Sequence, residues 1–215
     1  MRRSLSGLLL LVPALLAAQD HDHGAAPKIE NPGVPAGWSL RTDEPNQDAK
    51  VSLATMPPGW HLTTATSGIM WRAADSARGA YEVSAKVHLF PGGGGHEEAF
   101  GLFIGGSGLS GAGQRYTYFL IRGDGTFKVK AMNGTRAREI TPGWTPNAAI
   151  VQAKADGPVA NVITVAVSRD KVSFRVNGTE VWSGRASGLD VAGLAGLRVN
   201  HNLSLHVETL DLKRS

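Results

Sequence analysis

The chain contains no cysteine in its 215 residues. Disulfide bonds are therefore excluded, and so is a lipoprotein anchor, which requires a lipidated cysteine. A folded domain of this chain must be stabilised by its hydrophobic core alone.

The chain also lacks a strong excess of charge. Its 22 basic residues stand against 18 acidic ones, and removal of Arg2 and Arg3 leaves 20 against 18. No stripe of basic residues is visible, which indicates that nucleic acid is not a partner. Nothing in the sequence indicates an oligomeric state.

Several catalytic motifs are missing. No Gly-x-Ser-x-Gly motif occurs, so a serine hydrolase has no support. The glycine-rich segments at residues 92–95 and 105–113 lack the Gly-Lys-Ser/Thr ending of a phosphate-binding loop. We expect both segments to be loops at the rim of the fold.

The first residues have the pattern of a targeting segment. Arg2 and Arg3 precede an apolar run at residues 8–16, and small residues at 17–18 follow. This predicts a secretory signal peptide at residues 1–18 and a secreted or periplasmic protein, because the run is shorter than the roughly 20 residues that span a bilayer. A retained N-terminal anchor is the alternative, since a cut after residue 18 leaves Leu16 at the −3 position.

Residues 19–37 are polar and rich in proline and glycine, which predicts a flexible leader. A single domain is expected over residues 38–215. No later apolar run is long enough to suggest a membrane span once the signal peptide is removed.

The domain reads as a series of short strands with alternating apolar and polar residues. Hairpin turns are indicated at residues 123–125, 133–134 and 177–178, because Asn-Gly and Gly-containing pairs suit positive φ angles. Residues 147–155 are alanine-rich, but we expect strand or irregular structure there rather than helix. The pattern predicts an all-β, two-sheet sandwich whose core includes Val83, Val87, Phe100, Leu102, Phe119, Ile121, Val165, Phe174 and Val207.

Residues 172–181, Val-Ser-Phe-Arg-Val-Asn-Gly-Thr-Glu-Val, and the later Gly196-Leu197-Arg198 resemble the concanavalin A-like lectin/glucanase superfamily. Trp71-Arg72 and residues 79–82 resemble its opening sheet. The chain is similar in particular to laminin-G-like and 3-keto-disaccharide-hydrolase-like domains over residues 38–213. The resemblance implies an antiparallel jelly-roll sandwich, often with carbohydrate on its concave face.

The chain departs from the catalytic members of that superfamily. Family 16 glycoside hydrolases carry Glu-x-Asp-x-x-Glu on one strand, and this motif is absent here. Glu97 and Glu98 are adjacent, so on a strand they would face opposite sides. Distant strands could still bring together the carboxylate pair that glycoside hydrolysis needs.

A candidate ligand site comes from polar and aromatic residues near the end of the chain. Arg198, Asn200 and His206 would share one face, together with Glu208, if their two strands pair as a hairpin through residues 201–202. Tyr116, Tyr118 and Arg122 could add an aromatic and cationic edge, a mixture that can stack on and hydrogen-bond to a sugar. The alternative is an ordinary solvated face of a half-buried sheet.

Tryptophans could also serve as sugar platforms. Trp144 is the best candidate, because it lies in a segment rich in proline and glycine. Trp60, Trp71 and Trp182 could act in the same way, although such residues commonly belong to the core or its rim.

Metal sites are only weakly indicated. After cleavage at residue 18 the chain would begin Gln19-Asp20-His21, and its amine, amides and imidazole could chelate Cu(II) or Ni(II), with His23 assisting. The alternative is a polar leader with no metal role. Members of the superfamily often bind Ca²⁺, for which Asp124 and Asp156 are candidates without a recognisable run of ligands. No other cofactor is expected.

Three functions remain open from the sequence. The first is a non-catalytic module that binds carbohydrate or another extracellular ligand. The second is a glycoside hydrolase-like enzyme of the same fold, and the third is a structural or interaction domain without a small ligand. The missing carboxylate motif favours the first and the third, since fold alone does not decide function.

Overall fold

The computed structural model describes residues 33–91 and 98–215. The predicted signal peptide at 1–18, His21, most of the predicted leader and the glycine-rich segment 92–95 lie outside these residues. The first strand, β1, begins at Trp38.

The first sheet has eight strands, and all neighbouring strands are antiparallel. Its order from edge to edge is β1, β4, β14, β6, β7, β8 and β10, with β9 also paired to β8. The bounds are β1 Trp38–Thr42, β4 Gly68–Ala77, β14 Gly193–Val199, β6 Ala99–Ser107, β7 Arg115–Arg122, β8 Thr126–Asn133, β9 Arg136–Glu139 and β10 Thr145–Pro146.

The second sheet has seven strands, again antiparallel, in the order β13, β12, β11, β5, β15, β3 and β2. The bounds are β13 Thr179–Arg185, β12 Lys171–Val176, β11 Val159–Val167, β5 Tyr81–Leu89, β15 Leu203–Arg214, β3 Trp60–Thr64 and β2 Val51–Thr55. A short 3-10 turn, η1 (Asp48–Lys50), precedes β2.

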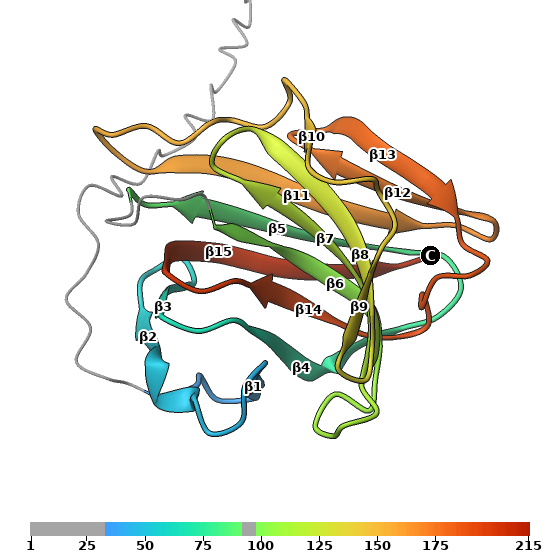
Figure 1. The fold of residues 1–215 in the computed structure, drawn as a ribbon, viewed down its shortest axis with the longest axis horizontal. Helices are drawn as coiled ribbons and strands as arrows, with labels where there is room; N and C mark the ends of the chain where they lie inside the picture. Colours follow the sequence, from blue (N-terminus) through green and yellow to red (C-terminus); the bar gives the residue numbers. More distant parts are fainter. Residues whose placement is uncertain (1–32, 92–97) are drawn as a thin grey trace, which may run out of the picture.

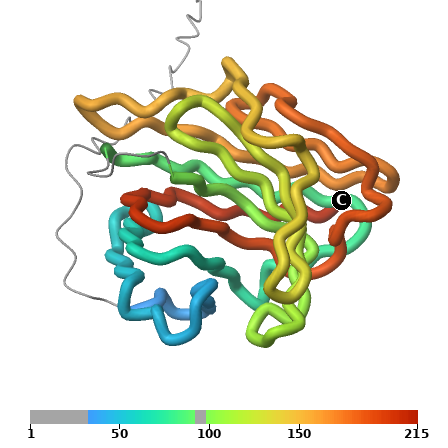
Figure 2. The backbone as a smooth tube through the Cα atoms, viewed as in Figure 1, coloured from blue at the N-terminus to red at the C-terminus, as the bar shows by residue number. Residues whose placement is uncertain are grey.

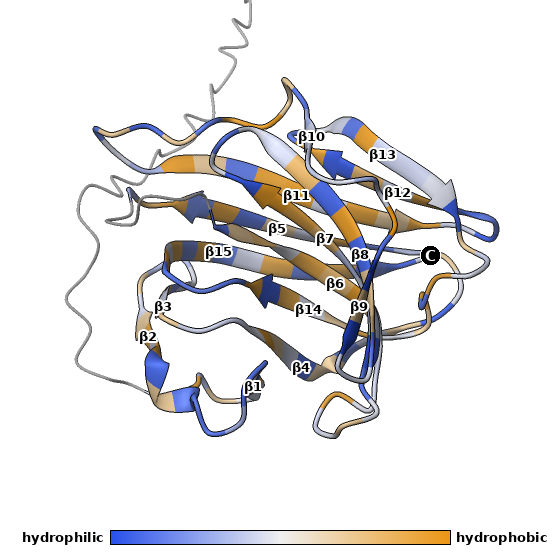
Figure 3. Ribbon diagram, in the orientation of Figure 1, coloured by the Kyte–Doolittle hydropathy of each residue, from blue (hydrophilic) through white to orange (hydrophobic). Residues whose placement is uncertain are grey.

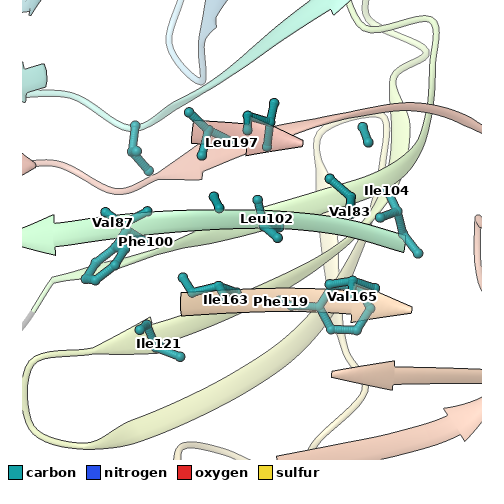
Figure 4. Packing of buried hydrophobic residues seen from close by; sticks show 14 of the residues in the cluster. Val83, Val87, Phe100, Leu102, Ile104, Phe119, Ile121, Ile163, Val165 and Leu197 are labelled. Atoms are coloured by element: carbon teal, nitrogen blue, oxygen red, sulfur yellow. The ribbon is translucent and has the colours of Figure 1, made fainter. Parts of the chain in front are cut away.

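The two sheets lie one over the other and enclose the main hydrophobic core (Figure 1). All the core residues predicted from the sequence are found there, each at most 2% exposed. Figure 4 shows Val83 and Val165 of the second sheet close to Leu102 and Phe119 of the first. Burial of each such side chain contributes roughly 1.5–3 kcal/mol, which is how a chain without disulfides can be stable. The fold is an all-β, two-sheet antiparallel jelly-roll sandwich, as predicted.

The predicted alternation is visible along the strands as bands of opposite hydropathy (Figure 3). In β7, Phe119 and Ile121 face the core, whereas Tyr118, Leu120 and Arg122 face outward. The outward set matters for the site, because it is aromatic and basic rather than uniformly polar.

The predicted hairpin turns are confirmed. Residues 123–125 join β7 to β8, residues 134–135 join β8 to β9, and Asn177-Gly178 joins β12 to β13. Asn177 and Gly178 have φ angles of 51° and 82°, which suit a turn that matches the twist of the strands.

The predicted hairpin between the last two strands is wrong. β14 lies between β4 and β6 in the first sheet, whereas β15 lies between β5 and β3 in the second. The connection at residues 200–202, with Asn202 at φ 53°, carries the chain from one sheet to the other. Figure 2 shows both strands, in red, crossing the middle of the molecule. Alternation indicates that a segment is a strand, but it does not indicate which sheet the strand joins.

The structure also shows the conformation of residues 147–155 and of the glycine-rich segment 105–113. Residues 147–155 are irregular, and the Asn161 side chain holds them by accepting a hydrogen bond from the Val151 amide and donating one to its carbonyl. Gly105 and Gly106 belong to β6 rather than to a loop, and a turn follows them. Leu109 in that turn packs on the outer face of the first sheet.

Candidate functional site

Most of the predicted site residues lie on the outer face of the first sheet. Tyr116, Tyr118 and Arg122 point outward from β7, and Arg198 does so from β14. Other strands add further rings and cations to the same face. We call this surface the basic-aromatic face; its rings are Trp71, Phe103, Tyr116, Tyr118 and Trp144, and its cations are Arg41, Arg122, Lys128, Lys130 and Arg198.

The strand register explains why these side chains meet. Tyr118 is paired with Lys130 of β8 on one side and with Phe103 of β6 on the other. Arg198 is paired with Gly101 of β6, which has no side chain to separate it from β7. Residues directly opposite each other on neighbouring strands project to the same face, so the rings and cations form one continuous surface.

The rings form a packed layer on the sheet rather than projecting into solvent. The centroids of Phe103 and Tyr116 are 5.2 Å apart, and those of Tyr116 and Tyr118 are 5.3 Å apart. Gly196 makes room for this layer, because a Cβ there would lie 2.6 Å from the Phe103 ring. The layer gives the face a rigid apolar floor on which the charged groups are placed.

Arg198 is the charged centre of the face. It is 5% exposed, and its two terminal nitrogens donate hydrogen bonds of 2.5 Å to the carboxylate oxygens of Asp43. Burial alone would lower the pKa of Arg198, but its hydrogen bonds to Asp43 outweigh that effect and the pKa is raised. The guanidinium also lies 5.6 Å from the Tyr118 ring centroid, so it remains a fixed cation.

Burial also raises the pKa of Tyr116 and Tyr118 above the usual tyrosine range, and Arg198 offsets part of the rise. Both hydroxyls are therefore protonated donors at neutral pH. Within residues 33–91 and 98–215, the Tyr116 hydroxyl and the Nε atoms of Arg122 and Arg198 are buried without a hydrogen-bond partner.

Trp144 lies at the β8 end of the face and is half-buried. The Arg122 guanidinium is 4.7 Å and the Lys128 ammonium 5.1 Å from its ring centroid. Two cations therefore fix the orientation of an indole that keeps part of its surface in solvent.

The carboxylates beside Trp144 are engaged by the same cations. Arg122 donates to Asp124 over 2.6 Å, and Lys128 donates to Glu139 over 2.6 Å. The hydrogen bond from Lys128 is the main reason that the pKa of Glu139 lies below its usual range. A depression of about 390 Å³ beside Asp43, lined in part by Glu44, Lys50 and Thr66, extends the polar surface at the other end.

Asn200 and His206 do not join the other predicted site residues. Asn200 follows β14, is half-buried and donates its backbone amide to the Ala99 carbonyl over 2.8 Å. His206 points outward from the second sheet, on the opposite side of the sandwich from Arg198, and its Nε2 lies 2.8 Å from the Pro58 carbonyl oxygen. The prediction that Arg198 and His206 share a face is wrong because β14 and β15 belong to different sheets.

His206 instead belongs to a group of buried histidines on the second sheet. His61 is 0% exposed with its Nε2 3.0 Å from the Ser204 hydroxyl, and His88 Nε2 lies 2.6 Å from Glu208. Burial, with a smaller effect of His206, lowers the pKa of His61 to about 4. These imidazoles turn to different partners, and the described residues contain no group of three or more histidine or acidic side chains placed to hold a metal ion.

The other tryptophans have structural positions. Trp60 and Trp182 pack partly buried against the core between the sheets. Trp71 belongs to the ring layer but is 7% exposed, which leaves little surface for a ligand. Trp144 is therefore the tryptophan best placed to contact a ligand on this face.

Sequence reasoning missed Arg41, Asp43, Lys128, Lys130 and Glu139. Lys128 and Lys130 could have been found, because the predicted hairpin at residues 123–125 already placed residues 126–132 beside Tyr118. Asp43 and Arg41 gave no such signal, since β1 is short and pairs with β4 across a long stretch of sequence.

Solved structures with the same architecture cover most of the chain. The carbohydrate-binding module CBM66 from Bacillus subtilis matches with a TM-score of 0.60 and 13% identity over 83% of this chain and 96% of that one. The fold is that of the concanavalin A-like lectins and glucanases. A Bacillus licheniformis β-glucanase matches with a TM-score of 0.58 and 10% identity over 90% and 100% of the two chains.

A Bacteroides ovatus family 16 glycoside hydrolase from a mixed-linkage glucan locus matches with a TM-score of 0.55 and 10% identity over 82% and 94% of the two chains. At these identities the similarity establishes the concanavalin A-like fold and no more. No family model and no curated protein matches the sequence. No helix of residues 33–91 and 98–215 is long and apolar enough to cross a membrane.

Proposed function

We propose that this protein is a non-catalytic concanavalin A-like module that binds carbohydrate on its basic-aromatic face. The observation that carries the proposal is the position of Trp144. Its half-buried ring is contacted by Arg122 and Lys128, which in turn donate hydrogen bonds to the carboxylates of Asp124 and Glu139. An aromatic platform ringed by hydrogen-bonding groups suits a sugar, which has both apolar C–H faces and hydroxyls.

The state of the carboxylates favours binding over catalysis. Glycoside hydrolysis needs a general acid whose pKa is raised, paired with a second carboxylate. On this face the pKa of Glu139 is lowered, and Asp43, Asp124 and Glu139 are each bonded to a cation. The missing Glu-x-Asp-x-x-Glu motif agrees with this assignment.

The proposal is tested by screening the purified protein on a glycan array and then repeating the hits with Trp144→Ala. We expect Trp144→Ala to weaken binding about tenfold, the loss of one stacking contact of roughly 1–1.5 kcal/mol, with little change in the unfolding midpoint. Val162→Ala, at an exposed apolar residue on the second sheet, is the control and should bind as the wild type does.

Three results would count against the proposal. Unchanged affinity of Trp144→Ala for the glycan would show that Trp144 does not contact the ligand. Release of reducing sugar from a bound glycan would establish the enzyme instead, and absence of binding to any glycan would favour the structural or interaction domain.

We further propose that the protein acts outside the cytoplasm, on the strength of residues 1–18. Mass spectrometry of the exported protein should find Gln19 as the first residue, or its cyclised form. A chain that still begins at Met1 would contradict this proposal, and a cyclised Gln19 would also remove the amine needed for a metal site at His21.

A further inference from the structure

Pairing of charges on the basic-aromatic face leaves two cations unmatched. Asp43 is bonded to Arg198, Asp124 to Arg122 and Glu139 to Lys128. Within residues 33–91 and 98–215, neither Arg41 nor Lys130 has a carboxylate within salt-bridge distance. The face therefore carries positive charge that its own residues do not neutralise.

Lys130 is partly buried, in a position where a cation without a salt-bridge partner is unfavourable. Its ammonium lies 5.9 Å from the Tyr118 ring centroid, next to the ring that Arg198 also contacts. Burial, and then the neighbouring charge of Lys128, lower the pKa of Lys130, and Glu139, opposite Lys130 on β9 but bonded to Lys128, offsets only part of this. A negative group supplied from outside the chain would relieve both effects.

Arg41 lies at the other end of the face. It projects from β1 opposite Ile69 of β4, and Ile69 in turn is paired with Arg198. Its charge acts on the Tyr116 hydroxyl, so it belongs to the same surface as the ring layer. Five strand spacings separate β1 from β8, a span of roughly 24 Å.

Two unmatched cations that far apart do not suit a single small anion. They suit an extended ligand with negative groups repeated along it. Between them lie the buried ring layer and the neutral Arg198–Asp43 pair, whose partly exposed carboxylate can accept hydrogen bonds from hydroxyls of the intervening part of the ligand.

We propose that the ligand of the basic-aromatic face is an acidic polysaccharide, whose repeated carboxylate or sulfate groups contact Lys130 and Arg41 while one of its sugar rings lies over Trp144. This inference rests on the proposed carbohydrate-binding function and specifies its ligand class. Nucleic acid is also an extended polyanion, and the test below therefore includes it as a competing outcome.

The test compares four polymers by isothermal titration calorimetry with the full-length mature chain. Polygalacturonate supplies carboxylates, dextran sulfate supplies sulfates, unmodified dextran and β-glucan supply neutral sugars, and oligo(dT) supplies phosphates. We expect one of the acidic polysaccharides to bind at least about tenfold more tightly than the neutral polymers at low salt. The difference should shrink at high salt, because exposed charges are screened within about 10 Å at 0.1 M. The stronger of the two acidic polymers identifies the anionic group.

The variants Lys130→Met and Arg41→Met remove the charges and keep most of the side-chain volume. Each should weaken binding of the acidic polymer about threefold, and the double variant about tenfold, with no effect on neutral polymers. Arg169→Met, at an exposed cation in the turn between β11 and β12 of the second sheet, is the matched control and should change nothing. Thermal unfolding of every variant checks that the fold is retained.

The outcomes separate this inference from the proposed function. Equal affinity for neutral and acidic polymers, or an unaffected double variant, overturns the acidic ligand and leaves carbohydrate binding in place. Absence of binding to every carbohydrate overturns both. Preferential binding of oligo(dT) that depends on Lys130 assigns the face to nucleic acid and overturns both as well.

Discussion

The guanidinium of Arg198 and the carboxylate of Asp43 are joined by two hydrogen bonds of 2.5 Å across 155 positions of the sequence. Arg198 is in β14 at the middle of the first sheet, and Asp43 directly follows β1 at its edge. The pair therefore holds the edge of the sheet to its centre and positions the cation next to Tyr118.

Asp43→Asn should destabilise the fold, because it leaves a buried guanidinium without its counter-charge. Since Asp43 is itself partly exposed, we expect a loss of about 2 kcal/mol in the free energy of unfolding, less than for a fully buried pair. Urea denaturation measures this loss of stability. Glu44→Gln, at an exposed neighbour, is the control. Equal losses in the two variants would show that the Arg198–Asp43 pair does not stabilise the fold.

The stability of the protein should fall in mildly acidic solution because of His61. Its pKa is lowered from 6.5 to about 4 in the folded protein, so between these values the unfolded chain binds a proton that the folded chain does not. The part of the free energy of unfolding that depends on neutral His61 amounts to about 2–3 kcal/mol. It is fully present above pH 6.5 and is lost as the pH falls towards 4.

Urea denaturation of the wild type and of His61→Gln from pH 7.5 to 4 tests this expectation. The variant should show a shallower loss of stability over that interval, because it lacks the imidazole whose pKa is lowered. His201→Gln, at a half-exposed histidine, should keep the full dependence. Parallel curves for wild type and His61→Gln would rule out this role for His61.

Gly196→Ala should disturb the ring layer. A Cβ at this position would meet the Met70 carbonyl of β4 and would lie 2.6 Å from the Phe103 ring. We expect a loss of about 2–3 kcal/mol and a displaced Phe103, measured by thermal unfolding and near-ultraviolet circular dichroism. Gly113→Ala, where a Cβ would have no neighbour within 4 Å, should be silent; a silent Gly196→Ala would mean that the sheet yields easily there.

Asn177 should matter more than an ordinary turn residue. Its side chain accepts a hydrogen bond from the Val162 amide and donates to the Ala149 carbonyl and to Asn161. Asn177→Ala should cost about 2 kcal/mol through lost hydrogen bonds and an unfavourable positive φ. Asn133→Ala, at the other Asn-Gly turn, should cost less than about 0.5 kcal/mol. Similar losses at both turns would contradict this assignment.

The core and the hairpins could be predicted because their signals are local. Val83, Phe119 and Val165 follow the period-two alternation of a strand with one buried face, and Asn177-Gly178 specifies its own turn. The placement of β14 and β15 could not be predicted in this way, because a short connection between strands serves equally well within a sheet or between two sheets. Because of that ambiguity, Arg198 and His206 were predicted on one face, although they lie on opposite sides of the sandwich.

The arrangement of the candidate site could be predicted in part for the same reason. Tyr116, Tyr118 and Arg122 share a face by alternation along one strand, and Trp144 was recognisable from its surroundings in the sequence. The Arg198–Asp43 bond joins segments that are far apart in the sequence. That Lys130 has no salt-bridge partner can be seen only when all the charged neighbours on the face are known. Such features follow from tertiary packing alone.

The position of β14 and β15 in the middle of their sheets has a consequence for how the chain folds. Until residues 193–214 have been synthesised, β4 and β6 of the first sheet and β3 and β5 of the second sheet lack the strand that joins them. Contacts between segments so distant in sequence make folding slow, on the order of milliseconds to seconds for β-sandwiches. A ribosome-bound chain that stops short of β14 should therefore remain sensitive to protease in β3, β4, β5 and β6.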